Sequence, residues 1–332
     1  MKSRGRSGKE AAHKARRTKM TVKTDRLVTL FGGGGFVGRY AAQSLFKAGV
    51  RIRIADREPK RAYFLKTLCG LGQIQFVRAD VGDPAQVAAA VEGADAVVNL
   101  VGILKGDFED VHVAGARNVA EAAAAAQVPA LVHVSAIGAD PEAPSAYGRS
   151  KGEGEAAVRA AFPAATIVRP SIAFGLEDDF VNRFARMAQR LPFLPVIRGA
   201  WRLQPVYVGD LGKAIALAAL DPADHAGRTY ELGGPQVLSL QELEQWICRE
   251  TGRNRPLVVI PDPVAGLFAR LAGWLPGAPI TRDQWLMMCR DNLASGAGFE
   301  AFGIRPTPLG AVAEGWMTLY RRHGRFARPS PS

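Results

Sequence analysis

The sequence has few cysteines and no long run of apolar residues. Cys69, Cys248 and Cys289 are the three cysteines in 332 residues, and they are widely separated. This spacing excludes a disulfide framework and the paired cysteines of a zinc site, and unpatterned cysteines suit a reducing cytoplasm. No apolar stretch approaches the roughly 18–20 residues that span a bilayer. We therefore expect a cytoplasmic protein, soluble or peripheral to a membrane.

Positive charge is concentrated at the N-terminus. The net charge is +12, but residues 1–26 contain ten Lys and Arg against Glu10 and Asp25, which leaves +4 for the other 306 residues. The first 20 residues lack the apolar core of a secretory signal. A basic arm can contact phosphates or anionic lipid. We nevertheless expect 1–26 to be a solvated, disordered tail without a specific nucleic-acid partner, and Met20 is an alternative start.

From Arg26 onwards, short apolar runs alternate with helical patterns. The expected strands are 27–31, 50–55, 74–77, 94–101, 130–135 and 166–168. The expected helices are 40–48, a Lys- and Leu-rich segment before the third strand, and the Ala-rich 113–126. Such alternation predicts βαβ units in a doubly wound parallel sheet, which is a Rossmann fold of the α/β class.

The regular alternation ends at Pro170. We expect a Rossmann domain over 27–170, to which 205–235 partly returns through a strand at 230–232. Residues 171–204 and 236–326 would form a smaller, mainly helical C-terminal lobe for a substrate or partner. In this lobe, 263–276 carries six apolar residues at helical spacing: Val264, Leu267, Phe268, Leu271, Trp274 and Leu275. That face either packs inside the lobe or contacts lipid, a quinone-like substrate or a partner subunit.

A glycine-rich loop stands between the first strand and the first helix. Gly32, Gly35 and Gly38 have G-x-x-G-x-x-G spacing, with Phe36 and Val37 between the last two. Glycine lets the backbone approach a pyrophosphate, and the following helix N-terminus offers free N–H groups to the anion. Because a strand, a helix and a second strand surround the loop as required, it predicts a dinucleotide site.

The second strand ends in an acid followed by a base. Asp56 is placed to accept hydrogen bonds from the adenosine ribose, which favours NAD(H). Arg57, with Arg61 one helical turn further on, is placed to hold a 2′-phosphate, which favours NADP(H). The sequence leaves both cofactors open.

A Ser–Tyr–Lys constellation follows the fifth expected strand. Tyr147 and Lys151 are four apart, so they share one face of a helix, and a nearby ammonium lowers the pKa of a phenol. Ser135, at the end of the strand, can donate a hydrogen bond to a substrate carbonyl. These three residues are the candidate catalytic set.

Taken together, these residues resemble the extended and atypical branches of the short-chain dehydrogenase/reductase superfamily. Longer strings, among them VVNLVGIL, SAYGRSKGEGE and QPVYVGDLGKAI, are similar to the NAD(P)H-binding accessory subunit family of respiratory complex I and its bacterial relatives. The similarity runs from about Leu27 to Phe326. The matching pieces are Gly32-x-x-Gly35-x-x-Gly38, Asp80-Val81, Asn99-Leu100-Val101-Gly102, Ser135, Tyr147-x-x-x-Lys151 and Arg169-Pro170.

The resemblance implies roles for these positions. Asp80 and Val81 would flank the adenine, and the segment Asn99, Leu100, Val101 and Gly102 would line the inner face of the cofactor. Tyr147 and Lys151 would meet the nicotinamide ribose, and Pro170 would close the nicotinamide pocket. It also implies a structural nucleotide held without turnover, complex I subunits as partners, and the cytoplasmic face of a bacterial inner membrane as the location.

One position departs from the family pattern. His112 stands where active extended members have Asn, which supports a proton relay. We expect His112 to pack or cap locally rather than act as a base. The departure favours a structural or regulatory nucleotide, while the intact Ser135, Tyr147 and Lys151 favour a working oxidoreductase or an epimerase/dehydratase.

Two further polar features are predicted to be structural. Glu177-Asp178-Asp179 is a single acidic cluster without further oxygen ligands, so we expect a solvated loop and no metal site. His133 lies in an apolar strand, where we expect a satisfied core histidine.

Overall fold

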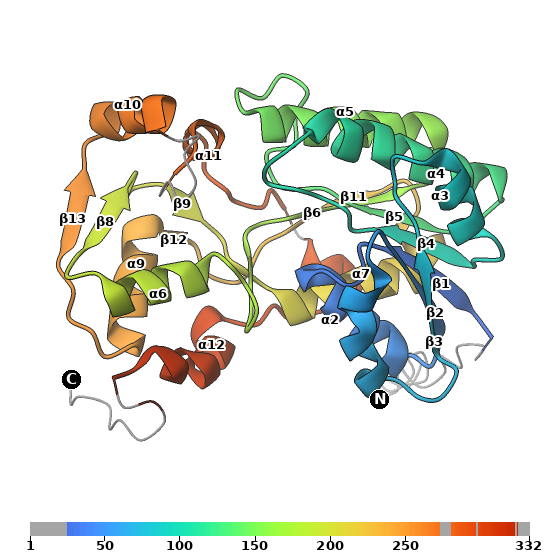
Figure 1. Cartoon of the computed structure of the whole chain (residues 1–332), viewed down its shortest axis with the longest axis horizontal. Helices are drawn as coiled ribbons and strands as arrows, with labels where there is room; N and C mark the ends of the chain where they lie inside the picture. The colour runs from blue at the N-terminus through green and yellow to red at the C-terminus, as the bar shows by residue number, and fades with distance from the viewer. Residues whose placement is uncertain (1–24, 273–279, 297, 323, 325–332) are drawn as a thin grey trace, which may run out of the picture.

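Seven parallel strands form the central sheet, in the order β11-β6-β5-β4-β1-β2-β3 (Figure 1). The computed structural model describes residues 25–272, 280–296, 298–322 and 324. The basic tail therefore lies outside the described residues, apart from its last two positions. The strands are β1 Leu27–Phe31, β2 Arg51–Asp56, β3 Ile74–Arg78, β4 Ala96–Asn99, β5 Leu131–Val134, β6 Thr166–Pro170 and β11 Thr229–Leu232. The Rossmann prediction is confirmed.

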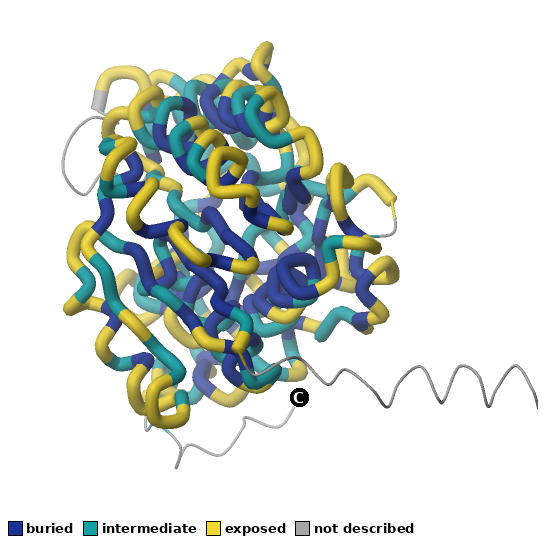
Figure 2. Tube along the Cα trace, turned by 90° about the vertical axis from the view of Figure 1, so that its right-hand side faces the viewer, coloured by how far each residue is buried: buried dark blue, intermediate teal, exposed yellow. Residues whose placement is uncertain are grey.

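Helices cover both faces of this sheet, which explains why β1, β4 and β5 are buried at every position. α2 Phe36–Lys47 and α7 Val208–Leu220 pack on one face. α3 Pro84–Val91, α4 Gly115–Ala125 and α5 Ala146–Ala161 pack on the other. The buried strands run through the middle of the molecule in Figure 2.

Three elements differ from the expected ones. α2 begins at Phe36, four residues before the expected start, because the helix begins directly at the glycine loop. Between β2 and β3 the chain forms a 3₁₀ helix, η1 Pro59–Leu68, which buries only Ala62 and Leu65 and so lacks the apolar stripe of a packed α-helix. Before α4, residues Glu109–Ala114 form a π-helical turn, η2, which contains His112.

The remaining elements form a second body, called here the C-terminal lobe. Its apolar cluster includes Leu203, Leu243, Ile247 and Trp316. Its elements are α6 Val181–Arg190, β8 Leu194–Ile197, β9 Arg202–Leu203, β12 Leu238–Ser239, α9 Leu240–Glu250, β13 Leu257–Ile260, α10 Asp262–Ala272, α11 Arg282–Met287, α12 Leu309–Met317 and η4 Thr318–Tyr320. β7 Ala173–Phe174 and β10 Val206–Tyr207 pair in the connection, and α8 Pro222–His225 and η3 Phe299–Phe302 lie beside the Rossmann sheet.

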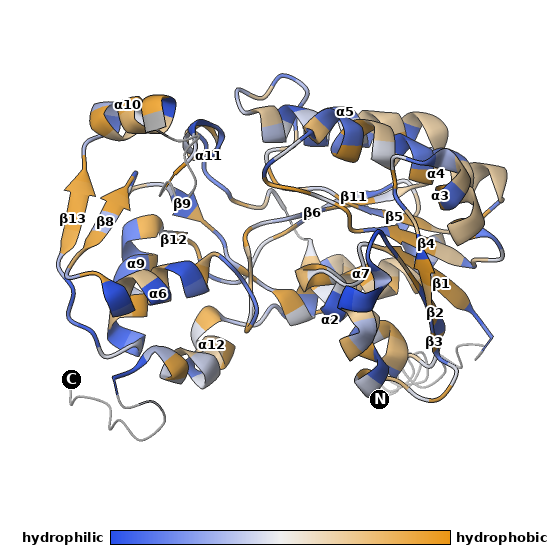
Figure 3. Cartoon of the chain, in the orientation of Figure 1, coloured by the Kyte–Doolittle hydropathy of each residue, from blue (hydrophilic) through white to orange (hydrophobic). Residues whose placement is uncertain are grey.

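The apolar face of α10 is exposed. Val264 is 57% exposed and Leu267 is 58% exposed, and on the neighbouring strand β13 Val259 is 60% exposed. Figure 3 shows β13 and α10 as hydrophobic elements at the end of the lobe far from the sheet. Trp274 and Leu275 lie outside the described residues. In the part of the chain that the structure describes, no helix is long and apolar enough to cross a membrane.

Candidate nucleotide-binding site

The glycine loop closes the carboxyl end of β1 at the point where the strand order reverses. Gly32 has a φ of +73°, a conformation that side chains disfavour, and a Cβ there would lie 3.3 Å from the backbone of Leu100 and Val101. A Cβ at Gly38 would lie 2.6 Å from the carbonyl oxygens of Gly32 and Gly33. Glycine is therefore favoured at Gly32 by its backbone conformation and by the segment after β4, and is required at Gly38 by the close approach of the helix to the loop.

The N-terminus of α2 is open for an anion. Gly35 is its N-cap, and no side chain among the described residues caps it. Its first N–H groups and its positive dipole end thus face the loop, as phosphate binding requires. Phe36 packs against Gly175, the residue that follows β7, so the loop is also fixed from the other side.

β2 ends in Asp56, which is partly hydrogen-bonded, and is followed by the exposed Arg57. Asp56 accepts a hydrogen bond from the Glu58 N–H through Oδ1, at 3.0 Å, which leaves its second oxygen available. Arg57 is exposed and has no ion-pair partner among the residues described, whereas Arg61 pairs with Glu58 at 2.5 Å. Asp56 and Arg57, the residues predicted to distinguish NAD(H) from NADP(H), therefore both lie at the end of β2. Among the described residues, no carboxylate neutralises the charge of Arg57.

The segment after β4 lies directly beside the glycine loop. Asn99 is buried, and its Oδ1 accepts from the Val101 N–H at 3.1 Å, so the side chain shapes the turn from within. The Leu100 N–H donates to the Phe31 carbonyl at 3.0 Å. A Cβ at Gly102 would lie 3.3 Å from the Lys151 Nζ, so this segment reaches the predicted catalytic set.

Asp80 and Val81 follow the end of β3, and Pro170 is the last residue of β6. The Asp80 Oδ1 accepts from the Gly82 N–H at 3.0 Å, and the Val81 carbonyl accepts from the Asn118 side chain at 2.8 Å. Pro170 ends β6, and its carbonyl accepts from the Ile137 N–H at 3.1 Å. All three lie at the carboxyl edge of the sheet, where ligands of open parallel sheets bind.

Ser135 directly follows β5, and Tyr147 and Lys151 lie on α5, from which the Lys151 side chain reaches the end of β5. The Lys151 amine donates to the Val134 carbonyl at 3.1 Å, and burial lowers its pKa to about 8. The Ser135 hydroxyl is buried and has no hydrogen-bond partner in the described chain. Burial raises the pKa of Tyr147 to about 12, so the lowering expected from the neighbouring ammonium is not found, and the phenol is protonated at neutral pH.

His112 is fully engaged by the protein. Its Nε2 accepts from the Ile103 N–H at 3.0 Å, so its Nδ1 carries the proton and donates to the Ser150 Oγ at 2.9 Å. The Ser150 hydroxyl donates in turn to the Tyr147 carbonyl at 2.9 Å. Burial, and then the charge of Lys151, lower the pKa of His112 to about 3. The ring, which also stacks on Phe108 at 5.3 Å, is a neutral structural group.

Sequence reasoning missed the residues that hold α5 in place. Glu155, which is buried on α5, accepts from the Nε and Nη2 of Arg169 on β6, both at 2.8 Å. Asp283 of α11 accepts from the first two N–H groups of α5, those of Ala146 and Tyr147. Ionic residues far apart in the chain give no pairing signal in a single sequence, so these partners could not have been found from it.

The acidic cluster after β7 is not the solvated loop that the sequence predicts, because Asp178 is buried and each of the three carboxylates has its own partners, Arg186 in the case of Asp179. Glu177 contacts Arg39 and accepts from the Tyr40 hydroxyl at 2.7 Å, both on α2. Asp178 is buried and accepts from the N–H groups of Gly175 and Asn182 at the start of α6. Within the described ranges, no group of three or more metal-ligating side chains is present.

His133 differs from the expected satisfied core histidine. It is buried, and its Nδ1 lies 3.3 Å from the Asn99 amide, but its Nε2 has no hydrogen-bond partner in the described part of the chain. Burial holds its pKa well below the usual value, so the ring is neutral.

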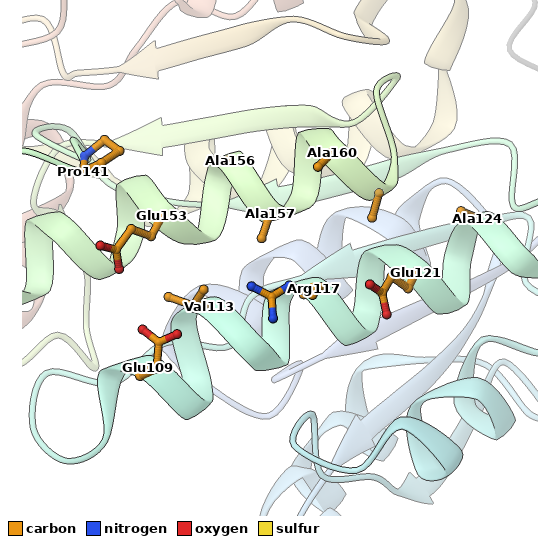
Figure 4. A pocket seen from close by; sticks show the side chains of 11 residues that line it. Glu109, Val113, Arg117, Glu121, Ala124, Pro141, Glu153, Ala156, Ala157 and Ala160 are labelled. Carbon is orange, nitrogen blue, oxygen red and sulfur yellow. The ribbon is translucent and has the colours of Figure 1, made fainter.

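A shallow groove between α4 and α5 lies outside this site (Figure 4). It is lined by alanines, including Ala157 and Ala160, and by charged residues, including Glu109, Arg117 and Glu153. Glu153, Ala157 and Ala160 come from α5, whereas Glu109 of η2 and Arg117 of α4 form the facing side, and Lys151 is buried in the protein. The groove therefore contains none of the residues predicted to bind nucleotide.

The residues present fit a dinucleotide. The glycine loop is a cradle that a single Cβ would fill, and the buried Ser135 hydroxyl is left for a ligand to satisfy. The fold, loop and strand edges define a Rossmann-type NAD(P)H-binding protein. A family model described as NAD(P)H-binding matches residues 32–182.

Relatives define the family more closely. The chain is 35% identical over 310 residues to the mitochondrial NADH dehydrogenase [ubiquinone] 1 alpha subcomplex subunit 9 of Rattus norvegicus, covering 90% of this chain and 81% of the relative. It is 30% identical to the NADH-ubiquinone oxidoreductase 40 kDa subunit of Neurospora crassa, covering 91% and 81%. The chain belongs to the family of these complex I subunits.

Other similar proteins are reductases. Ceramide reductase of Caulobacter vibrioides is 34% identical over 256 residues, which cover 74% of this chain and 76% of the relative. An NADPH-dependent quinone oxidoreductase of Escherichia coli, solved with NADPH, superposes with a TM-score of 0.72 at 22% identity, covering 89% of this chain and all of that one. The latter likeness concerns the fold.

Proposed function

We propose that this chain is a complex I accessory-type subunit in which NAD(P)H is held as a structural or regulatory group with little turnover. The family relationship over most of both chains supports the partner. The proposal of low turnover rests on one observation: both ring nitrogens of His112 form hydrogen bonds within the protein. In active members, Asn supports the relay from this position, whereas the ring nitrogens of His112 are already committed to the Ile103 N–H and the Ser150 hydroxyl.

The proposed partner or membrane face is the exposed apolar surface of α10 and β13. Val258 and Val259 of β13 and Val264 and Leu267 of α10 are all exposed, and Arg270 lies on the same helix. An exposed apolar surface of this kind suits a membrane surface or an apolar subunit surface. This supports a peripheral location on the cytoplasmic face of the inner membrane.

Gentle purification of the full chain from its native membranes tests this proposal. We expect mass spectrometry to find a bound nicotinamide dinucleotide at near one-to-one stoichiometry together with complex I subunits. We also expect the chain to sediment with membranes at low salt. A chain that purifies alone from the soluble fraction, without nucleotide, would contradict the proposal.

A working oxidoreductase is the second candidate, and the similarity to a ceramide reductase favours it. When bound, NAD(P)H would supply hydride at its nicotinamide. The buried Ser135 hydroxyl would orient a substrate carbonyl, and the protonated phenol of Tyr147 would donate the proton as the carbonyl is reduced. Lys151 would hold the cofactor ribose.

Tyr147→Phe separates the two candidates. If the chain is a reductase, the variant should lose about 100-fold or more of its turnover, because the general acid is removed, while nucleotide affinity should fall far less, because only one hydroxyl contact to the ribose is lost. The measurement is consumption of reduced nicotinamide with a panel of long-chain and small ketones. Tyr63→Phe, on the exposed η1, is the matched control. Equal slow rates for all three proteins would reject this candidate.

The choice between NADP(H) and NAD(H) is proposed to depend on Arg57. Since Arg57 is unpaired, Arg57→Ala should weaken NADPH binding by about ten-fold or more, the value of one charge-assisted contact, and leave NADH binding unchanged. Titration of both nucleotides measures this. Arg51→Ala, at the opposite end of β2, is the control. An equal loss for both nucleotides would show that Arg57 does not read the 2′-phosphate.

A further inference from the structure

The first turn of α11 reaches from the C-terminal lobe to the first turn of α5. Thr281 caps α11 in a reciprocal pair with Gln284, so this short helix starts at a defined point. Asp283 then projects to α5, where its Oδ1 lies 2.6 Å from the Ala146 N and its Oδ2 lies 3.2 Å from the Tyr147 N. The two partners are 137 and 136 residues away in sequence.

Asp283 completes the cap of the helix that carries Tyr147 and Lys151. Among the described residues, the local cap, Ser145, accepts from the Gly148 N–H alone, at 3.0 Å. The N–H groups of Ala146 and Tyr147 precede the first intrahelical hydrogen bond, so they need an external acceptor, and a carboxylate there is also favoured by the helix dipole. The backbone of Tyr147 is therefore fixed by a side chain of the other body.

The C-terminal lobe sets the position of Asp283. Trp285 packs on Gly266 of α10, where a Cβ would lie 3.0 Å from its ring, and the Arg198 guanidinium stacks on the same ring at 4.5 Å. After α11, the Asn292 Oδ1 accepts from the Ser171 hydroxyl at 2.6 Å, beside the end of β6. The segment is thus fastened at one end to the lobe and at the other end to the carboxyl edge of the sheet.

We propose that Asp283 is a positioning residue for the nucleotide site. Through its contact with α5, the C-terminal lobe controls how long the nucleotide is retained. This inference rests on the proposed nucleotide contacts of Tyr147 and Lys151. Lys151 is held independently by the Val134 carbonyl, so losing Asp283 releases the Tyr147 turn while Lys151 stays in place. Retention then falls although the glycine loop is intact.

The test compares the dissociation rate of NADPH from the full chain and its variants. Bound NADPH is displaced by excess oxidised nucleotide and followed by the fluorescence of the reduced nicotinamide. Asp283→Ala should dissociate about ten-fold faster, the upper part of what a lost cap costs. Asp283→Asn should be intermediate because one oxygen remains, and Asp283→Glu should restore part of the wild-type rate.

Asp291→Asn is the matched control, because Asp291 lies on the same segment but pairs with Arg202 of β9, not with α5. It should leave the dissociation rate unchanged. A general structural role would instead lower the melting temperature of both variants and leave the dissociation rates alike, which would overturn the proposal. If the wild-type chain retains no NADPH, the proposed nucleotide contacts fail; if it does and Asp283→Ala dissociates equally slowly, only the role of Asp283 fails.

Discussion

Gly38→Ala is expected to remove nucleotide binding, with a dissociation constant raised by about 100-fold or more. The new Cβ would lie 2.6 Å from the carbonyl oxygens of Gly32 and Gly33, and both are backbone atoms that cannot turn aside. The helix would have to move away from the loop, which would withdraw its N-terminus from the phosphates. Titration with NADPH and NADH measures the effect, and circular dichroism checks that the variant is folded.

Gly315→Ala provides the comparison. Gly315 is in α12, and a Cβ there meets no atom within 4 Å. Alanine at that position should stabilise the helix by about 0.5–1 kcal/mol and leave nucleotide binding unchanged. If Gly38→Ala binds as tightly as Gly315→Ala, the glycine loop is not the phosphate site.

The second large effect concerns Glu244, a carboxyl inside the C-terminal lobe. It lies on the buried face of α9 between Leu243 and Ile247, is 0% exposed, and neither oxygen has a hydrogen-bond partner among the described residues. Burial raises its pKa from 4.5 to about 8. Glu244→Leu should therefore increase the free energy of unfolding at pH 8, by about 2–4 kcal/mol.

The raised pKa of Glu244 also determines whether the free energy of unfolding rises or falls with pH. The folded state holds the Glu244 proton up to about pH 8, while the unfolded chain releases it near 4.5. Below pH 4.5 the carboxyl is protonated in both the folded and the unfolded state, and its contribution to the free energy of unfolding is fully present. It is lost as the pH rises from about 4.5 to 8, at up to about 1.4 kcal/mol per pH unit. Glu244→Gln should flatten this slope.

Urea unfolding at pH 5, 6.5 and 8 measures both expectations. Glu92→Gln, which replaces an exposed carboxylate at the end of α3, should keep the wild-type slope. A Glu244→Gln protein with the same slope as the wild type would mean that the carboxyl is ionised or solvated in the folded lobe.

Local patterns predicted the Rossmann sheet because each βαβ unit carries its own signal. The apolar runs at β1 and β4, and the glycines between β1 and α2, are contiguous in sequence, and their meaning does not depend on distant residues. The same holds for Tyr147 and Lys151, whose spacing on one helix places them together. The site residues that could be predicted are those whose geometry is local.

Residues that act across the fold were not predictable from this sequence. No local pattern marks Asp283, and its role becomes visible only through its two hydrogen bonds to α5. Glu155 and Arg169 pair between a helix and a strand 14 residues apart, without a repeat that would mark them. The apolar stripe of 263–276 fitted either burial or exposure, because hydrophobic spacing specifies a face and not what covers it.

The edge strand β11 has a consequence for how the molecule is made. The sheet that holds the nucleotide ends in residues 229–232, which pair with β6, and α7 packs against α2 directly behind the glycine loop. While the chain is being synthesised, β6 has an open edge and α2 an uncovered face until about two thirds of the sequence has emerged. A nascent chain or a fragment ending near residue 182 would contain every glycine of the loop and still lack the framework that holds it, so loading with nucleotide must follow completion of the later segment.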